Sequence, residues 1–182
     1  MDLKFSDEFN AIASIAEIEA ARTGHKRILP EHLMLGLIRH KDNYARKALL
    51  SLGADLKELK KMLDDIVFIE DANMAVARIL PTKAAARLVH AACYEAFKAE
   101  SSELLSTHLL LALCRSEDNS CREILDKAGI RYKNLLEHLK ENSGFRPDTT
   151  IKTPKMEEAM SALGEQLTNL LGSSKSKTIF PS

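Results

Sequence analysis

The chain has 182 residues, enough for one domain or for a compact double domain followed by a tail. Apolar residues make up 45% and charged residues 29%, which is typical of a globular protein and excludes a disordered or membrane-embedded class. The 26 basic residues equal the 26 acidic ones, so the basic excess that drives duplex binding is missing.

The N-terminal residues lack the charged and then apolar layout of a signal peptide. No apolar run approaches the ~20 residues that a membrane span needs. The three cysteines, Cys93, Cys114 and Cys121, form no CxxC pair, which favours small core thiols in a reducing compartment. We therefore expect a cytoplasmic protein with no membrane or nucleic-acid partner.

The first predicted helix begins at Ser6, whose hydroxyl suits an N-cap, and Asp7 and Glu8 add negative charge to its first turn. Apolar residues then mark one buried stripe: Phe5, Phe9, Ile12, Ala13, Ala16 and Ala20. A second helix begins near Pro30 and is apolar almost all round, so we expect it in the middle of the unit.

A third helix is predicted to end at Leu52 and Gly53, because a glycine just past a helix end usually adopts the left-handed conformation. Asp55 then caps a fourth helix. The apolar positions of that helix are Leu59, Met62, Leu63 and Ile66. The segment from Glu70 to Leu80 is predicted to be a short connection.

The same pattern returns at a constant offset of 76 positions. Pro30–Leu37, which contains His32, aligns with Ser106–Leu113, which contains His108. The gapless match also pairs Ser6 with Thr82, Glu19 with Glu95, Arg39 with Arg115, Gly53 with Gly129 and Leu63 with Leu139. The sequence therefore predicts an all-α fold in which two tandem, pseudo-symmetric four-helix repeats form one compact bundle.

We place the first repeat at residues 1–70, the second at 71–142, and a linker and tail at 143–182. The tail carries an amphipathic stripe from Met156 to Leu170. A lone helix cannot bury such a stripe, so it docks on the repeats or leads toward a further module.

Motifs for chemistry are missing from the sequence. It contains no Walker loop, no HExxH pair and no nucleophile elbow, so no catalytic residue, metal ligand or cofactor is predicted in this chain. His32 and His108 occupy equivalent first-turn positions without further ligands at suitable spacing. We therefore expect both to be structural, hydrogen-bonded histidines.

These segments resemble the N-terminal domain of the Clp family of AAA+ unfoldases, most of all the ClpC type. The resemblance rests on Phe5-Ser6, the Pro30–Leu37 motif, its weaker echo at Ser106–Leu113 and the two glycine corners, and it spans Phe5 to Lys140. It implies a module that binds adaptor proteins and unfolded or marked substrates for an ATPase ring and a ClpP-type peptidase. ATP and magnesium would belong to the ATPase modules.

The resemblance also implies where partners bind, with a peptide groove near the caps Ser6 and Thr82. In ClpC-type domains phosphoarginine is recognised around the acidic residue before the motif histidine, which here is Glu31. Glu31 can equally be a first-turn acid favoured by the helix dipole. In the second copy Thr107 takes this position, and a neutral hydroxyl cannot make a charge-assisted bond. The candidate binding residues are thus Ser6, Glu31, Thr82 and Thr107.

Two functions follow as expectations. In the first, the chain is the non-catalytic recognition domain of a Clp-type unfoldase and is monomeric when isolated. In the alternative, it is a stand-alone accessory subunit that stabilises or gates a Clp peptidase complex.

Overall fold

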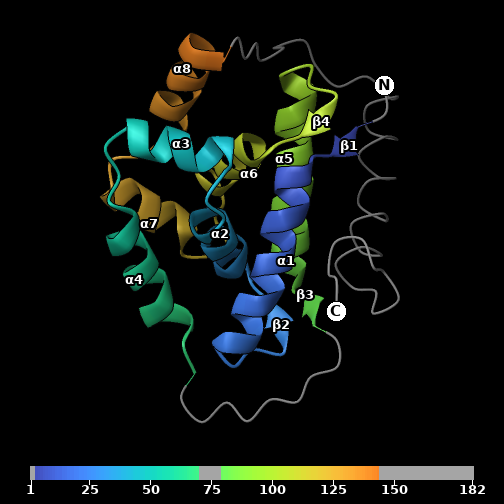
Figure 1. Ribbon diagram of the computed structural model, residues 1–182, viewed down its shortest axis with the longest axis vertical. Coiled ribbons are helices and arrows are strands. Elements are labelled where there is room, and N and C mark those ends of the chain that lie inside the picture. The colour runs from blue at the N-terminus through green and yellow to red at the C-terminus, as the bar shows by residue number, and fades with distance from the viewer. Residues whose placement is uncertain (1–2, 70–78, 144–182) are drawn as a thin grey trace.

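The computed structural model describes residues 3–69 and 79–143. The first copy contains β1 (Lys4–Phe5), α1 (Asp7–Arg22), β2 (Arg27–Ile28), α2 (Pro30–Arg39), α3 (Tyr44–Ser51) and α4 (Leu56–Val67). The second contains β3 (Leu80–Pro81), α5 (Lys83–Lys98), β4 (Glu103–Leu104), α6 (Ser106–Leu113), α7 (Cys121–Lys127) and α8 (Tyr132–Ser143) (Figure 1). The all-α fold with two four-helix copies is confirmed, while the predicted tail stripe and most of the predicted connection lie outside the described residues.

The helix starts follow the capping residues that the sequence indicates. Ser6 Oγ accepts a hydrogen bond from Phe9 N at 3.1 Å, and Thr82 Oγ1 accepts one from Ala85 N at the same distance. Asp55 accepts from the backbone of Lys57 and Glu58 at the start of α4. Each cap satisfies donors that have no partner within the helix.

Four two-residue strands are a feature that the sequence did not predict. β1 pairs in parallel with β4, and β2 pairs in parallel with β3, so each strand of one copy is bound to a strand of the other. The two pairs lie at opposite ends of the bundle (Figure 1). Because the offset of 76 positions converts one pair into the other, the two copies are related by a pseudo-twofold exchange.

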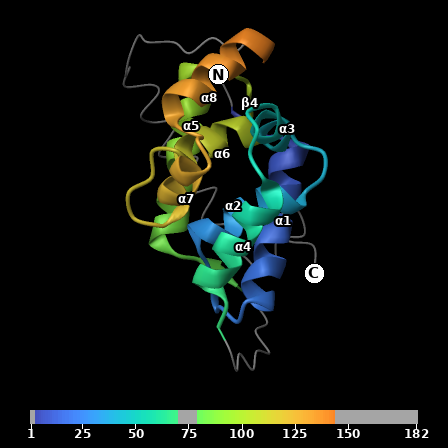
Figure 2. The ribbon, with the colours of Figure 1, turned by 90° about the vertical axis from the view of Figure 1, so that its left-hand side faces the viewer.

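The apolar helices α2 and α6 form the centre of the bundle, with α1 and α5 on opposite sides of them (Figure 2). Leu33, Leu35, Leu109 and Leu111 are fully buried there. The copies interlock, because α3 packs on α6 and α7 packs on α2. One continuous core therefore serves both repeats.

The predicted glycine corners have the backbone geometry that requires glycine. Gly53 has φ 85° and Gly129 has φ 80°, both in the left-handed region. Open space surrounds the position of an added Cβ at each site, so the requirement is conformational rather than steric.

All three cysteines are buried, and burial raises the pKa of Cys93 and of Cys114 to about 12. Thiols in that state are protonated at neutral pH and act as small core residues. Among residues 3–69 and 79–143, no helix is long and apolar enough to cross a membrane.

Candidate protein-binding site

An open groove lies where the N-terminal ends of α1 and α3 approach the β4–α6 connection, and we call it the α1–α3 groove. It has a volume of about 640 Å³. Four carboxylates line it, from Asp7, Glu8, Asp42 and Glu103, together with the predicted site residue Ser6. The basic groups in the lining are Lys47, which lies 3.4 Å from Asp42, and His40. The groove is therefore acidic, and it offers favourable electrostatics to a cationic group.

Glu8, one of the lining residues of this groove, joins the two copies. Its Oε1 accepts a hydrogen bond from Tyr44 N at 3.0 Å, at the start of α3. Its Oε2 accepts one from Ser106 N at 2.5 Å, at the start of α6. Ser106 Oγ in turn accepts from Ala45 N at 2.9 Å. One carboxylate thus occupies the point where two positive helix ends converge.

Glu31 makes the corresponding bond on the other side of the pseudo-twofold axis. Its side chain is only 6% exposed, and Oε2 accepts from Ser120 N at 3.0 Å at the start of α7. Ser120 aligns with Tyr44 at the repeat offset. Glu8 in α1 and Glu31 in α2 therefore bind backbone N–H groups at equivalent positions of the two copies. Neither glutamate has an acidic counterpart, since Ala84 corresponds to Glu8 and Thr107 corresponds to Glu31.

The predicted residues Thr82 and Thr107 have different surroundings from their first-copy counterparts. Thr82 Oγ1 donates to Ile28 O at 3.2 Å in addition to capping α5. Thr107 is buried in α6. Further along α5, Arg87 donates two bonds to Asp118, at 3.0 and 2.6 Å. Their counterparts, Ala11 and Asp42, both line the α1–α3 groove without such a pair.

The two motif histidines act within the fold. The Nδ1 of each accepts a backbone bond at 2.9 Å, in His32 from Leu29 N and in His108 from Leu105 N. His32 Nε2 also lies 2.8 Å from Thr23 Oγ1. Burial lowers the pKa of His32 to about 3, assisted by His25 and Arg22, and burial lowers the pKa of His108 to about 4. Both are therefore neutral near pH 7.

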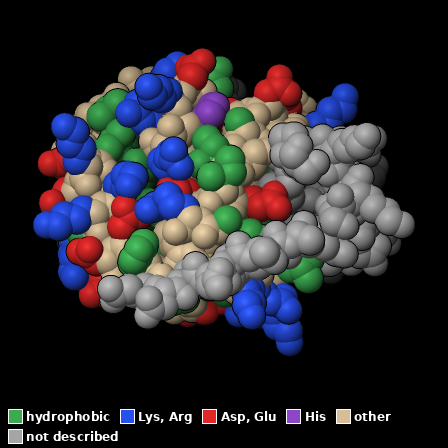
Figure 3. Space-filling model, turned by 60° about the horizontal axis from the view of Figure 1, so that its bottom comes forward, with side chains coloured by type: hydrophobic (Ala, Val, Ile, Leu, Met, Phe, Trp, Pro, Cys, Tyr) green, Lys and Arg blue, Asp and Glu red, His purple; other side chains and the backbone are tan. Residues whose placement is uncertain are grey.

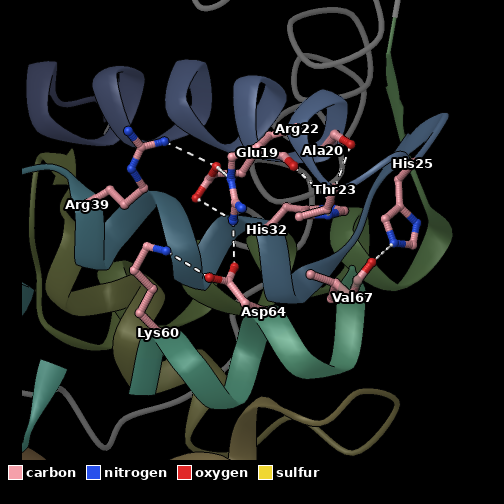
Figure 4. A network of polar contacts seen from close by, with 10 residues as sticks. All are labelled: Glu19, Ala20, Arg22, Thr23, His25, His32, Arg39, Lys60, Asp64 and Val67. Carbon is pink, nitrogen blue, oxygen red and sulfur yellow. Dashed lines mark hydrogen bonds and ion pairs between the residues drawn. The ribbon is translucent and has the colours of Figure 1, made fainter. Parts of the chain in front are cut away.

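Each copy also contains a buried glutamate with two cations. Glu19 is fully buried and pairs with Arg22 at 2.5 Å and with Arg39 at 3.1 Å. Arg22 continues the network to Asp64 of α4, which also binds Lys60 (Figure 4). The second copy repeats the arrangement with Glu95, Lys98 and Arg115. These networks connect helices, and the buried acids point away from solvent.

Within the described ranges, no cluster of three or more His, Cys, Asp or Glu side chains could hold a metal ion. On the face shown in Figure 3, Lys and Arg side chains lie among acidic and apolar ones, without a continuous basic field. The described residues thus form a helical scaffold with an acidic groove and buried polar networks that connect its helices.

The sequence placed Ser6 in the groove region but did not single out Glu8 or Glu103 as groove residues. Glu103 lies 95 positions after Glu8 and reaches the groove only through the β1–β4 pairing. The sequence distinguishes Glu8 in one way, because its counterpart in the second copy, Ala84, is not acidic.

Taken together, the fold is a duplicated helical repeat module of the kind found at the N-terminus of Clp chaperones. The family model described as the Clp repeat (R) N-terminal domain matches residues 4–128 and again 80–175. The chain belongs to this family.

Curated relatives are chaperone subunits much longer than this chain. It is 28% identical over 127 residues to the chaperone protein ClpB of Oceanobacillus iheyensis, covering 70% of this chain and 16% of the relative. It is 28% identical over 127 residues to the negative regulator of genetic competence ClpC/MecB of Bacillus subtilis, covering 70% and 15%. The chloroplast chaperone ClpC2 of Oryza sativa subsp. japonica is 30% identical over 133 residues, covering 72% and 14%.

Solved structures show the same fold at low sequence identity. The Hsp104 N-terminal domain from Candida albicans matches with a TM-score of 0.62 and 17% identity, covering 80% of this chain and 95% of that one. The N-terminal domain of ClpD from Arabidopsis thaliana matches with a TM-score of 0.58 and 17% identity, covering 74% and 91%.

Proposed function

We propose that this chain is a protein-recognition module of the Clp type, which binds segments of adaptor or substrate proteins in the α1–α3 groove. The observation that carries the proposal is the acidic lining of that groove, with Asp7, Asp42 and Glu103 around Ser6. The family membership supports the class of function, because the family is that of Clp N-terminal repeat domains.

The groove favours a cationic side chain that carries no phosphoryl group. Glu8 already accepts bonds from Tyr44 N and Ser106 N, so these donors are not available to a phosphoryl oxygen. A phosphate dianion would also face the carboxylates of Asp7 and Glu103 at close range, which costs electrostatic free energy. We therefore assign unmodified arginine or lysine side chains to this groove.

Recognition of phosphoarginine at Glu31 requires a different step. The Glu31 carboxylate is buried and bound to Ser120 N, so a guanidinium could reach it only if the start of α7 moved away. That site is a second, conditional part of the proposal, and its test is separate from that of the α1–α3 groove.

The test uses three peptides of one sequence that differ at one position, which holds arginine, phosphoarginine or glutamate. Amide chemical shifts are followed by NMR during each titration. We expect the arginine peptide to shift the signals of Asp7, Asp42 and Glu103, and the glutamate peptide to leave them unchanged. Equal shifts with arginine and glutamate peptides would refute the assignment of the groove to cationic side chains.

Variants separate the two sites. Asp42→Asn combined with Glu103→Gln should weaken the arginine peptide severalfold, because both carboxylates are exposed groove acids. Glu31→Ala should leave that peptide unaffected. If Glu31→Ala also leaves binding of the phosphoarginine peptide unchanged, Glu31 is not a ligand-binding residue.

A further inference from the structure

A second groove lies in the second copy, where the end of α6 meets α7 and the start of α8, and we call it the α6–α8 groove. Its volume is about 660 Å³. Four cationic side chains line it: Arg115, Arg122, Arg131 and Lys133. Two carboxylates, Glu117 and Asp126, lie among them, so the cations exceed the acids by two. The groove therefore carries a charge opposite to that of the α1–α3 groove.

The lining acids leave much of this positive charge unpaired. Arg131 binds Asp126 closely, at 2.6 Å, whereas Arg122 lies 3.7 Å from Glu117, beyond hydrogen-bond distance. Lys133 is exposed, and none of the ion pairs among the described residues involves it. Donors on Arg122 and Lys133 are therefore free to bind an anionic group.

Arg115 and Tyr132 form one wall of the groove. The Arg115 guanidinium lies 4.7 Å from the centre of the Tyr132 ring, a cation–π contact that restrains its position. Its contact with Glu95 is long, at 3.5 Å, and Glu95 already pairs with Lys98 at 3.1 Å and accepts from the Tyr132 hydroxyl at 2.8 Å. Arg115 is thus held in position while its side chain remains 56% exposed.

The first copy shares three of the four cations of this lining and differs at other positions, because Arg115, Arg122 and Lys133 correspond to Arg39, Arg46 and Lys57. At the repeat offset, Glu117, Asp126, Arg131 and Tyr132 correspond to Lys41, Leu50, Asp55 and Leu56. The counterpart of Arg131 is therefore the acid that caps α4. The α6–α8 groove therefore differs from the equivalent positions of the first copy in its fourth cation, Arg131, and in the aromatic side chain of Tyr132.

We propose that the α6–α8 groove docks an acidic segment of a partner protein, with aspartate or glutamate side chains bound between Arg122, Arg115 and Lys133. Charge complementarity supports this occupant, and the groove is within the size range of sites that enclose several side chains rather than one ion. The inference goes beyond the recognition of cationic groups in the α1–α3 groove and does not depend on it.

The test measures binding of a fluorescein-labelled oligoglutamate peptide by anisotropy at low and at physiological salt. We expect saturable binding that weakens as salt rises. The double variant Arg122→Glu/Lys133→Glu should weaken binding about tenfold or more, because two attractive contacts become repulsive. The control Lys26→Glu/Lys83→Glu changes the net charge equally, at exposed positions that neither line the groove nor align with its lining, and should change the dissociation constant less than about twofold.

Several outcomes would overturn the proposal. These are the absence of oligoglutamate binding at low salt, an equal loss in both double variants, or full displacement of the peptide by inorganic phosphate at matched ionic strength. The last result would make the groove a small-anion site. Far-UV circular dichroism and thermal melts establish that the variants are folded. Binding of the arginine peptide in the α1–α3 groove should be unaffected by Arg122→Glu/Lys133→Glu, so failure of one proposal leaves the other standing.

Discussion

Gly36 of α2 lies directly against the backbone of Ile12 in α1. A Cβ atom added at Gly36 would stand 2.5 Å from the Ile12 carbonyl oxygen and 3.2 Å from Ala16 N. Real Cβ atoms do not approach backbone atoms so closely, so α1 or α2 would have to shift. The second copy has Ala112 at the equivalent position, so the α1–α2 contact imposes a requirement that the α5–α6 contact does not.

Gly36→Ala should therefore destabilise the protein by about 1–3 kcal/mol, the range for overpacked cores, although alanine is the better helix former. Urea unfolding followed by circular dichroism measures this. Gly53→Ala is the comparison variant, because its surroundings are open and its cost is limited to the positive φ. An unchanged midpoint for Gly36→Ala would show that the close approach is not rigid.

Glu8→Ala should lower stability by about 1–3 kcal/mol, because it leaves the backbone donors of Tyr44 and Ser106 without their carboxylate. Asp7→Ala, at the neighbouring exposed position, should cost less. The added substitution Thr107→Glu should recover part of the loss, since Glu31 satisfies Ser120 N from the corresponding position. If the double variant is no more stable than Glu8→Ala, the two glutamates are not interchangeable.

Glu100→Gly should stabilise the protein by about 0.5–1 kcal/mol. Glu100 has φ 54°, a conformation that a non-glycine residue adopts at a cost, and the first copy has Gly24 with φ 85° at the same position. A gain in melting temperature would show that the backbone strain relieved in the folded state outweighs the added conformational entropy of the unfolded chain. Gly24→Glu should have the opposite sign.

Stability should fall as the pH drops below about 6.5. In the unfolded chain His32 and His108 regain pKa values near 6.5, whereas in the folded state burial holds them at about 3 and about 4. Between these values the unfolded state binds more protons, so each histidine contributes a slope of about 1.4 kcal/mol per pH unit.

His32→Asn keeps an acceptor for Leu29 N and removes the titrating ring. Its unfolding free energy should therefore depend less on pH than that of the wild type between about pH 5 and about pH 6.5. Urea titrations across this range measure the slope, with half-buried His138→Gln as the comparison. A slope unchanged by His32→Asn would contradict a neutral, buried His32.

Much of the fold could be predicted because it depends on local pattern. Capping at Ser6, Thr82 and Asp55, the left-handed glycines at positions 53 and 129, and the central placement of α2 all follow from residue type and periodicity. The strands could not be predicted, because Lys4–Phe5 and Leu80–Pro81 are too short for an alternating pattern and pair only with segments far away in the chain.

By itself, the sequence determined that this protein is a duplicated helical module, because the 76-residue offset and the helix signals are both properties of order along the chain. Only the tertiary structure decided which side chains meet across the two copies. The carboxylate that binds the start of α3 comes from Glu8. It does not come from position 107, the counterpart of Glu31, which holds a threonine. Glu103 reaches the same groove through the pairing of β4 with β1. The physical reason is that the pseudo-twofold exchange brings together residues from opposite repeats, and such contacts leave no periodic signal in either one.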